Sequence, residues 1–87
     1  MNDNKIVINE KAILVGIIHG EINELIINEH LDELELLTRT AGAKVIGKIT
    51  QKISKINPAT FIGKGKANQL ILQAKELNAN IIIFDQE

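Results

Sequence analysis

The segment with the clearest potential for chemistry is Gly63-Lys64-Gly65-Lys66, which lies between an expected strand end and an expected helix. Glycine lets the backbone adopt positive φ angles or approach a ligand closely. The first amides of the following helix are free, and they lie at the positive end of the helix dipole. Together with the lysine ammonium groups, they would suit the phosphate of a nucleotide or of an RNA backbone. The alternative is that the glycines serve a tight turn and that both lysines are simply solvated.

The spacing of this segment differs from that of the common nucleotide-binding loops. The phosphate-binding loop of nucleoside triphosphatases requires a Gly, four further residues and then Gly-Lys-Ser/Thr. Neither Ser nor Thr follows Lys64 or Lys66. The dinucleotide-binding pattern requires a third glycine, where this chain has Asn68 or Gln69. We therefore expect no nucleoside triphosphatase site in this chain.

A second basic group lies upstream, where alternating apolar and polar residues predict a strand at 44–53. Lys48 and Lys52 lie on this strand, and Lys55 lies on the turn after it. If the strand neighbours the Gly-Lys segment, Lys48 and Lys52 would extend the same basic surface. The alternative is that they are solvated lysines of an edge strand, which protect a sheet against aggregation.

The other polar residues form no catalytic or metal-binding pattern. His19 and His30 lack the spacing of metal ligands, so we expect them to be surface or loop residues. Asp85 ends an expected buried strand, a position where α/β folds often place functional groups. No Ser-His-Asp or paired-carboxylate arrangement is present, and we expect no catalysis by this chain.

Hydrophobic periodicity predicts an α/β fold with the element order βαββαβ. We expect a small, mostly parallel four-stranded sheet with two helices and right-handed crossovers. The short third strand is expected to pair antiparallel, and 19–28 to form a variable connection. The expected strands are 12–18, 44–53, 60–62 and 80–85, and the expected helices are 29–41 and 67–77. The first helix is expected to face inward with Leu31, Leu34, Leu37 and Ala41.

Length and composition indicate one small domain, residues 1–87. The formal net charge of −1 gives no overall attraction to nucleic acid, so any such contact must come from a local patch. There is no cysteine, no signal-peptide pattern and no apolar run approaching the about 20 residues of a membrane span. We expect a cytoplasmic domain without a membrane span.

The segment TQKISKINPATFIGKGKANQL, residues 50–70, closely resembles the N-terminal signature of the HflX-type translational GTPases. The flanking segments 11–17, 31–47 and 79–87 are similar to the same family. One departure is Ile53, where the family often has another basic residue. The matching positions are Gln51, Lys52, Pro58, Thr60, Phe61, Ile62, Gly63, Lys64, Gly65 and Lys66.

This resemblance implies the N-terminal subdomain of a larger GTPase that binds the large ribosomal subunit through rRNA and acts in ribosome splitting or rescue. GTP and Mg²⁺ are then expected only in the GTP-binding domain, which these residues do not include, so no cofactor is expected here. Expected partners are the large subunit, its rRNA and the GTP-binding domain of the same polypeptide, with self-association of the fragment also open. The implied contact residues are Gly63, Lys64, Gly65, Lys66, Lys52, Lys48 and Gln51.

Two alternatives remain open at this point. The Gly-Lys-Gly-Lys segment could hold the phosphates of ATP, since nucleotide binding outside the GTP-binding domain is ascribed to some members of the family. The chain could instead be a regulatory domain that packs on the GTP-binding domain.

Overall fold

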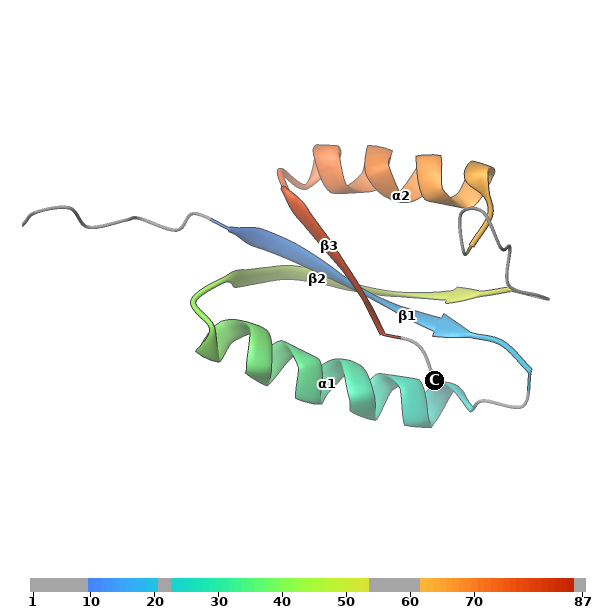
Figure 1. Ribbon diagram of the computed structural model, residues 1–87, viewed down its shortest axis with the longest axis horizontal. Helices are drawn as coiled ribbons and strands as arrows, with labels where there is room; N and C mark the ends of the chain where they lie inside the picture. Colours follow the sequence, from blue (N-terminus) through green and yellow to red (C-terminus); the bar gives the residue numbers. More distant parts are fainter. Residues whose placement is uncertain (1–9, 21–22, 54–61, 86–87) are drawn as a thin grey trace, which may run out of the picture.

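The three-layer arrangement is clear in the computed structural model, which describes residues 10–20, 23–53 and 62–85 (Figure 1). Three parallel strands form one sheet in the order β2-β1-β3. A helix follows each of the first two strands. The elements are β1 (Lys11–Ile18), α1 (Glu24–Thr40), β2 (Lys44–Lys52), α2 (Lys64–Glu76) and β3 (Ile81–Asp85).

β1 is the central strand, as its continuous apolar run predicts. Every residue from Ala12 to Ile18 is buried, because helices cover both faces of the sheet at this strand. Successive side chains alternate between the faces. Ala12, Leu14 and Ile18 pack on one face with Ile27 and Leu31 of α1, whereas Ile13, Val15 and Ile17 pack on the other with Leu70 and Ala74 of α2.

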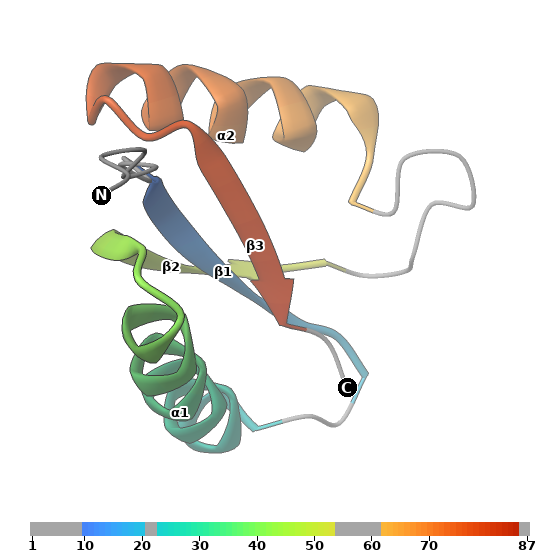
Figure 2. The same cartoon turned by 60° about the vertical axis from the view of Figure 1, so that its left-hand side comes forward.

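The two helices lie on opposite faces of the sheet, as Figure 2 shows. The chain passes from β1 to β2 in one direction and then returns across β1 to reach β3. Because parallel crossovers are right-handed, a reversal of direction places the second helix on the opposite face. Each helix follows a strand and leads back to the start of the next parallel strand. The amino ends of both helices therefore lie at the edge of the sheet where the strands end.

The predicted fourth strand is wrong. The described residues form three strands in the order βαβαβ, and all three are parallel. Of the predicted strand 60–62, residues 60 and 61 lie outside the described part, and Ile62 lies in a bend. Ile62 is buried in the cluster between the sheet and α2, so its hydrophobicity serves an anchoring contact before the helix instead of strand pairing.

α1 begins earlier than its predicted start at Glu29. Asn23 is the N-cap, and its side chain accepts a hydrogen bond of 2.6 Å from the amide of Leu25. The first turns belong to the helix because Ile27 is fully buried against β1. The predicted inward face was correct at Leu31 and Leu34 but wrong at Leu37, which is exposed, and at Ala41, which is the C-cap and also exposed. The helix instead buries Thr38 one turn after Leu34.

β2 contains an irregularity that the simple alternation of residues did not predict. Ala12 pairs with Val45, but Ile13 pairs with Gly47, so the register shifts at Ile46. A shift of one residue moves the following side chains to the other face. Val45 packs on the α1 side and Ile46 on the α2 side, as ordinary alternation requires. After the shift Ile49 also packs on the α2 side, where alternation from Val45 alone would have placed it on the α1 side.

No helix in the described part of the chain is long and apolar enough to cross a membrane.

Candidate nucleic-acid interface

The Gly-Lys-Gly-Lys segment forms the first turn of α2. Gly63 is the N-cap, with φ of 89° and ψ of 148°, a conformation that L-residues with a side chain rarely adopt. The Ala67 amide donates to the Gly63 carbonyl at 3.0 Å, so the amides of Lys64, Gly65 and Lys66 precede the helical hydrogen bonds. No side chain caps this end and no acidic residue lies in the first turn. In the described first turn, therefore, no acidic residue neutralises the positive end of the helix dipole.

Gly65 lies in open space. A Cβ atom added there would meet no described atom within 4 Å, and Gly65 does not have the positive φ that Gly63 has. Glycine within a helix costs about 0.5–1 kcal/mol relative to alanine. Neither packing nor backbone conformation in the described structure therefore requires glycine at this position, and the residue is exposed with no described atom beside its Cα.

Lys66 connects the start of α2 to the end of β2. Its Nζ donates a hydrogen bond of 2.7 Å to the carbonyl oxygen of Lys52. An ammonium group has three donors, so this bond leaves others for a phosphate. Lys64 and Lys52 are exposed, and Lys66 is half-buried. The structure thus brings Lys64 and Lys66 to the edge of the sheet where β2 ends. The Lys52 side chain is at the position paired with Ile18, on the α1 face of the sheet, and only its carbonyl oxygen contacts Lys66.

Gln51 lies on the α2 side of β2, at the position paired with Ile17. It contributes to an open groove of about 320 Å³ between β2 and α2. The other lining residues all belong to α2: Gln69, Leu72, Gln73 and Glu76. Of these groove residues, only Gln51 was predicted from the sequence to be a candidate contact. The spacing of Lys66, Gln69, Gln73 and Glu76 along one side of a helix is the signal that could have revealed the others.

Lys48 lies apart from this group, on the opposite face of the sheet. Its Nζ contacts Asp32 Oδ1 at 2.9 Å and Glu35 Oε1 at 2.8 Å on α1. Glu35 also receives two hydrogen bonds from Arg39. The hydrogen bonds to Glu35 and then to Asp32 raise the pKa of Lys48, and those from Lys48 and then Arg39 lower the pKa of Glu35. The structure therefore does not bring Lys48 together with the first turn of α2.

The ion pairs of Lys48 with Asp32 and Glu35 are expected to stabilise the folded chain at neutral pH and to lose this effect in strong acid and strong base. The Glu35 contribution is complete above the ordinary pKa of 4.5 and is lost as the pH falls through the lower pKa of the folded state. The Lys48 contribution is complete below 10.5 and is lost as the pH rises through the higher pKa of the folded state. We expect Lys48→Met to lower the midpoint of thermal unfolding at neutral pH but much less at about pH 3. An equal decrease at both pH values, measured by circular dichroism, would contradict this account.

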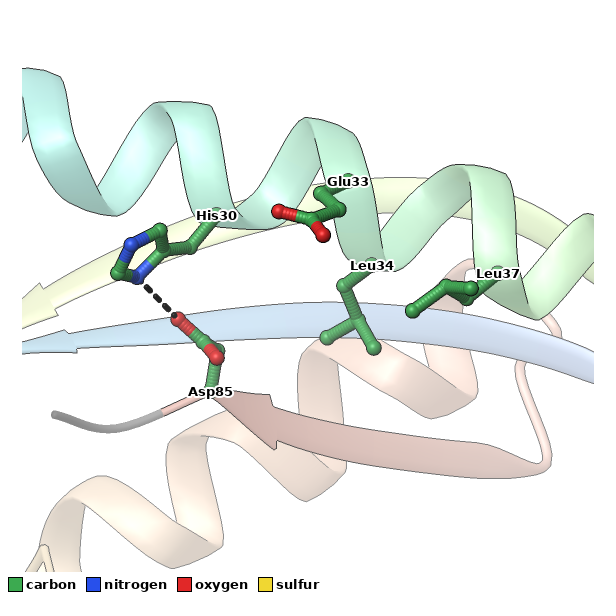
Figure 3. Close-up of a pocket in the computed structure, with 5 residues that line it drawn as sticks. All are labelled: His30, Glu33, Leu34, Leu37 and Asp85. Carbon is green, nitrogen blue, oxygen red and sulfur yellow. Dashed lines mark ion pairs between the residues drawn. The ribbon is translucent and has the colours of Figure 1, made fainter.

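A second groove lies between α1 and the end of β3 (Figure 3). It measures about 270 Å³, and its lining includes Glu33, Leu34 and Leu37. His30 Nδ1 and Asp85 Oδ2 approach to 3.5 Å across it, and both side chains are partly buried. His30 was expected to be a surface or loop residue, and the only sequence indication of this pair was the position of Asp85 at a strand end. Within the described ranges, no cluster of three or more His, Cys, Asp or Glu residues could hold a metal ion.

Comparison with known proteins identifies the family to which this chain belongs. Residues 28–87, which include α2 and its Gly-Lys-Gly-Lys turn, match the family described as GTP-binding GTPase N-terminal. The chain belongs to this family. The GTP-binding GTPase N-terminal match covers all of the candidate interface, from Gln51 on β2 to Glu76 on α2.

Individual proteins that are similar to this chain support the same family assignment. The GTPase HflX of Flavobacterium psychrophilum is 44% identical over 78 residues, which are 90% of this chain and 19% of that protein. The GTPase HflX of Caldanaerobacter subterraneus subsp. tengcongensis is 45% identical over 78 residues, 90% of this chain and 17% of that protein. The GTPase HflX of Alkalihalophilus pseudofirmus is 40% identical over 79 residues, 90% of this chain and 18% of that protein. The expected resemblance to HflX N-terminal domains is confirmed, and the chain spans less than a fifth of the length of these relatives.

Proposed function

We propose that residues 1–87 act as the N-terminal, rRNA-binding domain of an HflX-type GTPase that docks on the large ribosomal subunit during ribosome splitting or rescue. The observation that carries this proposal is the first turn of α2, where free amides and the lysines Lys64 and Lys66 meet without an acidic residue. Membership of the GTP-binding GTPase N-terminal family supports it. Because ribosomes are the target, the cytoplasm is the proposed location.

The physical basis is the match between this turn and an RNA backbone. Phosphate groups bind favourably at helix amino ends, where free amides and the helix dipole act together. Lys64 adds a solvated ammonium group, and Lys66 follows it in the same turn. Lys52 lies at the nearby end of β2, with its side chain on the α1 face, and would contribute from that side. A small basic surface of this kind can bind RNA even though the whole chain has a net charge of −1.

The other proposed contact residues contribute unequally. Gly63 sets the backbone conformation of the turn, and Gly65 keeps its outer surface open. Gln51 lies in the adjoining groove. Lys48 is expected to contribute least, because two carboxylates on the other face of the sheet already neutralise it. Hydrolysis of GTP, with its Mg²⁺, is assigned to a GTP-binding domain that these residues do not include.

Co-sedimentation with purified large ribosomal subunits at increasing salt concentration tests the proposal. The wild-type chain is expected to bind, and its affinity to fall steeply with salt because binding to phosphates releases counterions. Equilibrium dialysis with ATP tests the nucleotide-binding alternative in parallel. Binding of ATP without binding of subunits would overturn the proposal, and binding of neither would favour a regulatory domain that packs on the GTP-binding domain.

Gly65→Ala separates the role of this glycine in binding from any role in folding. We expect the variant to be more stable by about 0.5 kcal/mol, because alanine reduces the entropy of the unfolded chain and meets no described atom. We expect its affinity for large subunits to fall, because the methyl group occupies the open space through which a phosphate would approach the turn. Chemical denaturation and co-sedimentation measure the two effects. Undiminished affinity would show that RNA does not approach Gly65 closely.

A further inference from the structure

The groove between α2 and β2 is lined mainly by side-chain amides. Gln51 contributes from the strand, and Gln69 and Gln73 contribute from successive turns of the helix. Among the hydrogen bonds that join described residues, none uses these three amides. Each amide offers two donor hydrogens and an acceptor oxygen. The groove therefore presents hydrogen-bonding groups of both kinds to a molecule that enters it.

The amide groove continues directly from the basic first turn of α2. Lys66, Gln69 and Gln73 are spaced by three and four residues, which places them along one side of the helix. Gln69 lies about 4.5 Å beyond Lys66 along the helix axis. A single nucleotide can span this separation, with its phosphate at the first turn and its base beside the amides.

The charges along the groove favour one orientation of such a nucleotide. Lys64 and Lys66 lie at the end where α2 begins, and Glu76 lines the opposite end. A phosphate is attracted to the first end and repelled from the second. Leu72 is 60% exposed and lines the groove, so it offers an apolar surface on which the face of a base can pack.

We infer that the groove formed by Gln51, Gln69 and Gln73 binds an unpaired RNA base whose phosphate lies on the first turn of α2. Sequence-specific recognition of RNA generally uses unpaired bases, whose hydrogen-bonding edges are accessible. Glutamine can form paired hydrogen bonds with a base edge. This inference rests on the proposed rRNA-binding function and adds a base-recognition site to its phosphate contacts.

Fluorescence anisotropy with two labelled probes tests the inference: a short unpaired RNA of mixed sequence and an abasic ribose-phosphate strand of the same length. We expect the wild-type chain to prefer the RNA by about tenfold, the order of one well-formed amide–base contact. In Gln69→Leu/Gln73→Leu, the two probes are expected to bind with about equal affinity, because binding of the RNA weakens while binding of the abasic strand is unchanged. Asn68→Leu removes an exposed amide of α2 that does not line the groove, and its preference is expected to match that of the wild type.

The outcomes distinguish this inference from the proposed function. Binding of wild type to large subunits, together with equal affinity for the two probes or no affinity for either, would overturn only the base site. A preference that survives in Gln69→Leu/Gln73→Leu would also overturn it. Absence of wild-type binding to large subunits would overturn the proposed function and, with it, this inference.

Discussion

Replacement of both lysines in the first turn of α2, Lys64→Ala/Lys66→Ala, is expected to weaken binding to large ribosomal subunits by roughly 10- to 100-fold at low salt. The variant lacks two ammonium groups beside the free amides of the helix. The slope of log affinity against log salt is expected to become shallower by about two, since each lost phosphate contact changes it by about one. Co-sedimentation across a salt series measures both quantities.

A matched variant, Lys44→Ala/Lys75→Ala, controls for the change in net charge. Lys44 begins β2 and Lys75 lies in the last turn of α2, so both are at the opposite edge of the sheet, and both are exposed. This control is expected to bind nearly as well as the wild type. Because Lys66 also donates to the Lys52 carbonyl, thermal unfolding must show that the first variant remains folded at the assay temperature. Equal losses in the two variants would refute a localised site.

Gly16→Ala is expected to destabilise the fold strongly. The added Cβ would overlap Cγ2 of Ile27 and lie 3.1 Å from Cδ1 of Leu31, where α1 crosses β1. Overpacking of this kind costs about 1–3 kcal/mol, a large share of the roughly 4–13 kcal/mol expected for a chain of this length. Urea denaturation of the wild type and the variant measures the loss.

Gly47→Ala is the matched control for Gly16→Ala. A Cβ added at Gly47 would meet Ile13 and Leu77 at 3.8 Å, which is an ordinary contact distance. We therefore expect a much smaller change in unfolding free energy. Ile27→Ala is expected to cost less stability in the Gly16→Ala background than in the wild type, because it also removes the overlapping methyl group. Additive losses in that double variant would contradict the proposed steric cause.

The sequence predicted the central features of the fold because they rest on burial patterns. The short, β-branched apolar run at 12–18 indicates a strand covered on both faces, and the structure has such a strand in β1. The extent of α1 was missed because Leu25 and Ile26 are apolar but exposed, which obscures the helical pattern before Ile27. The register shift at Ile46 has no local signal, since it depends on how β2 pairs with β1.

The candidate interface was predictable where it is local in sequence and unpredictable where it depends on distant contacts. Gly63 to Lys66 form a helix start, as their position before an amphipathic segment indicated. The face on which Lys48 lies could not be read from alternation alone, because the shift at Ile46 precedes it. The role of Gln69 and Gln73 beside Gln51 depends on the packing of α2 over β2, which no single segment specifies.

Directed cleavage of rRNA tests the central claim most directly, namely that the start of α2 faces RNA on the large subunit. The chain contains no cysteine, so Asn68→Cys provides a unique attachment point for an iron chelate on an exposed position of α2. Leu36→Cys places the same probe on α1, on the opposite face of the sheet, at a side chain that is 66% exposed. We predict strong, localised cleavage of large-subunit rRNA from residue 68 and little from residue 36. Equal cleavage from both positions, or cleavage only from residue 36, would contradict the account.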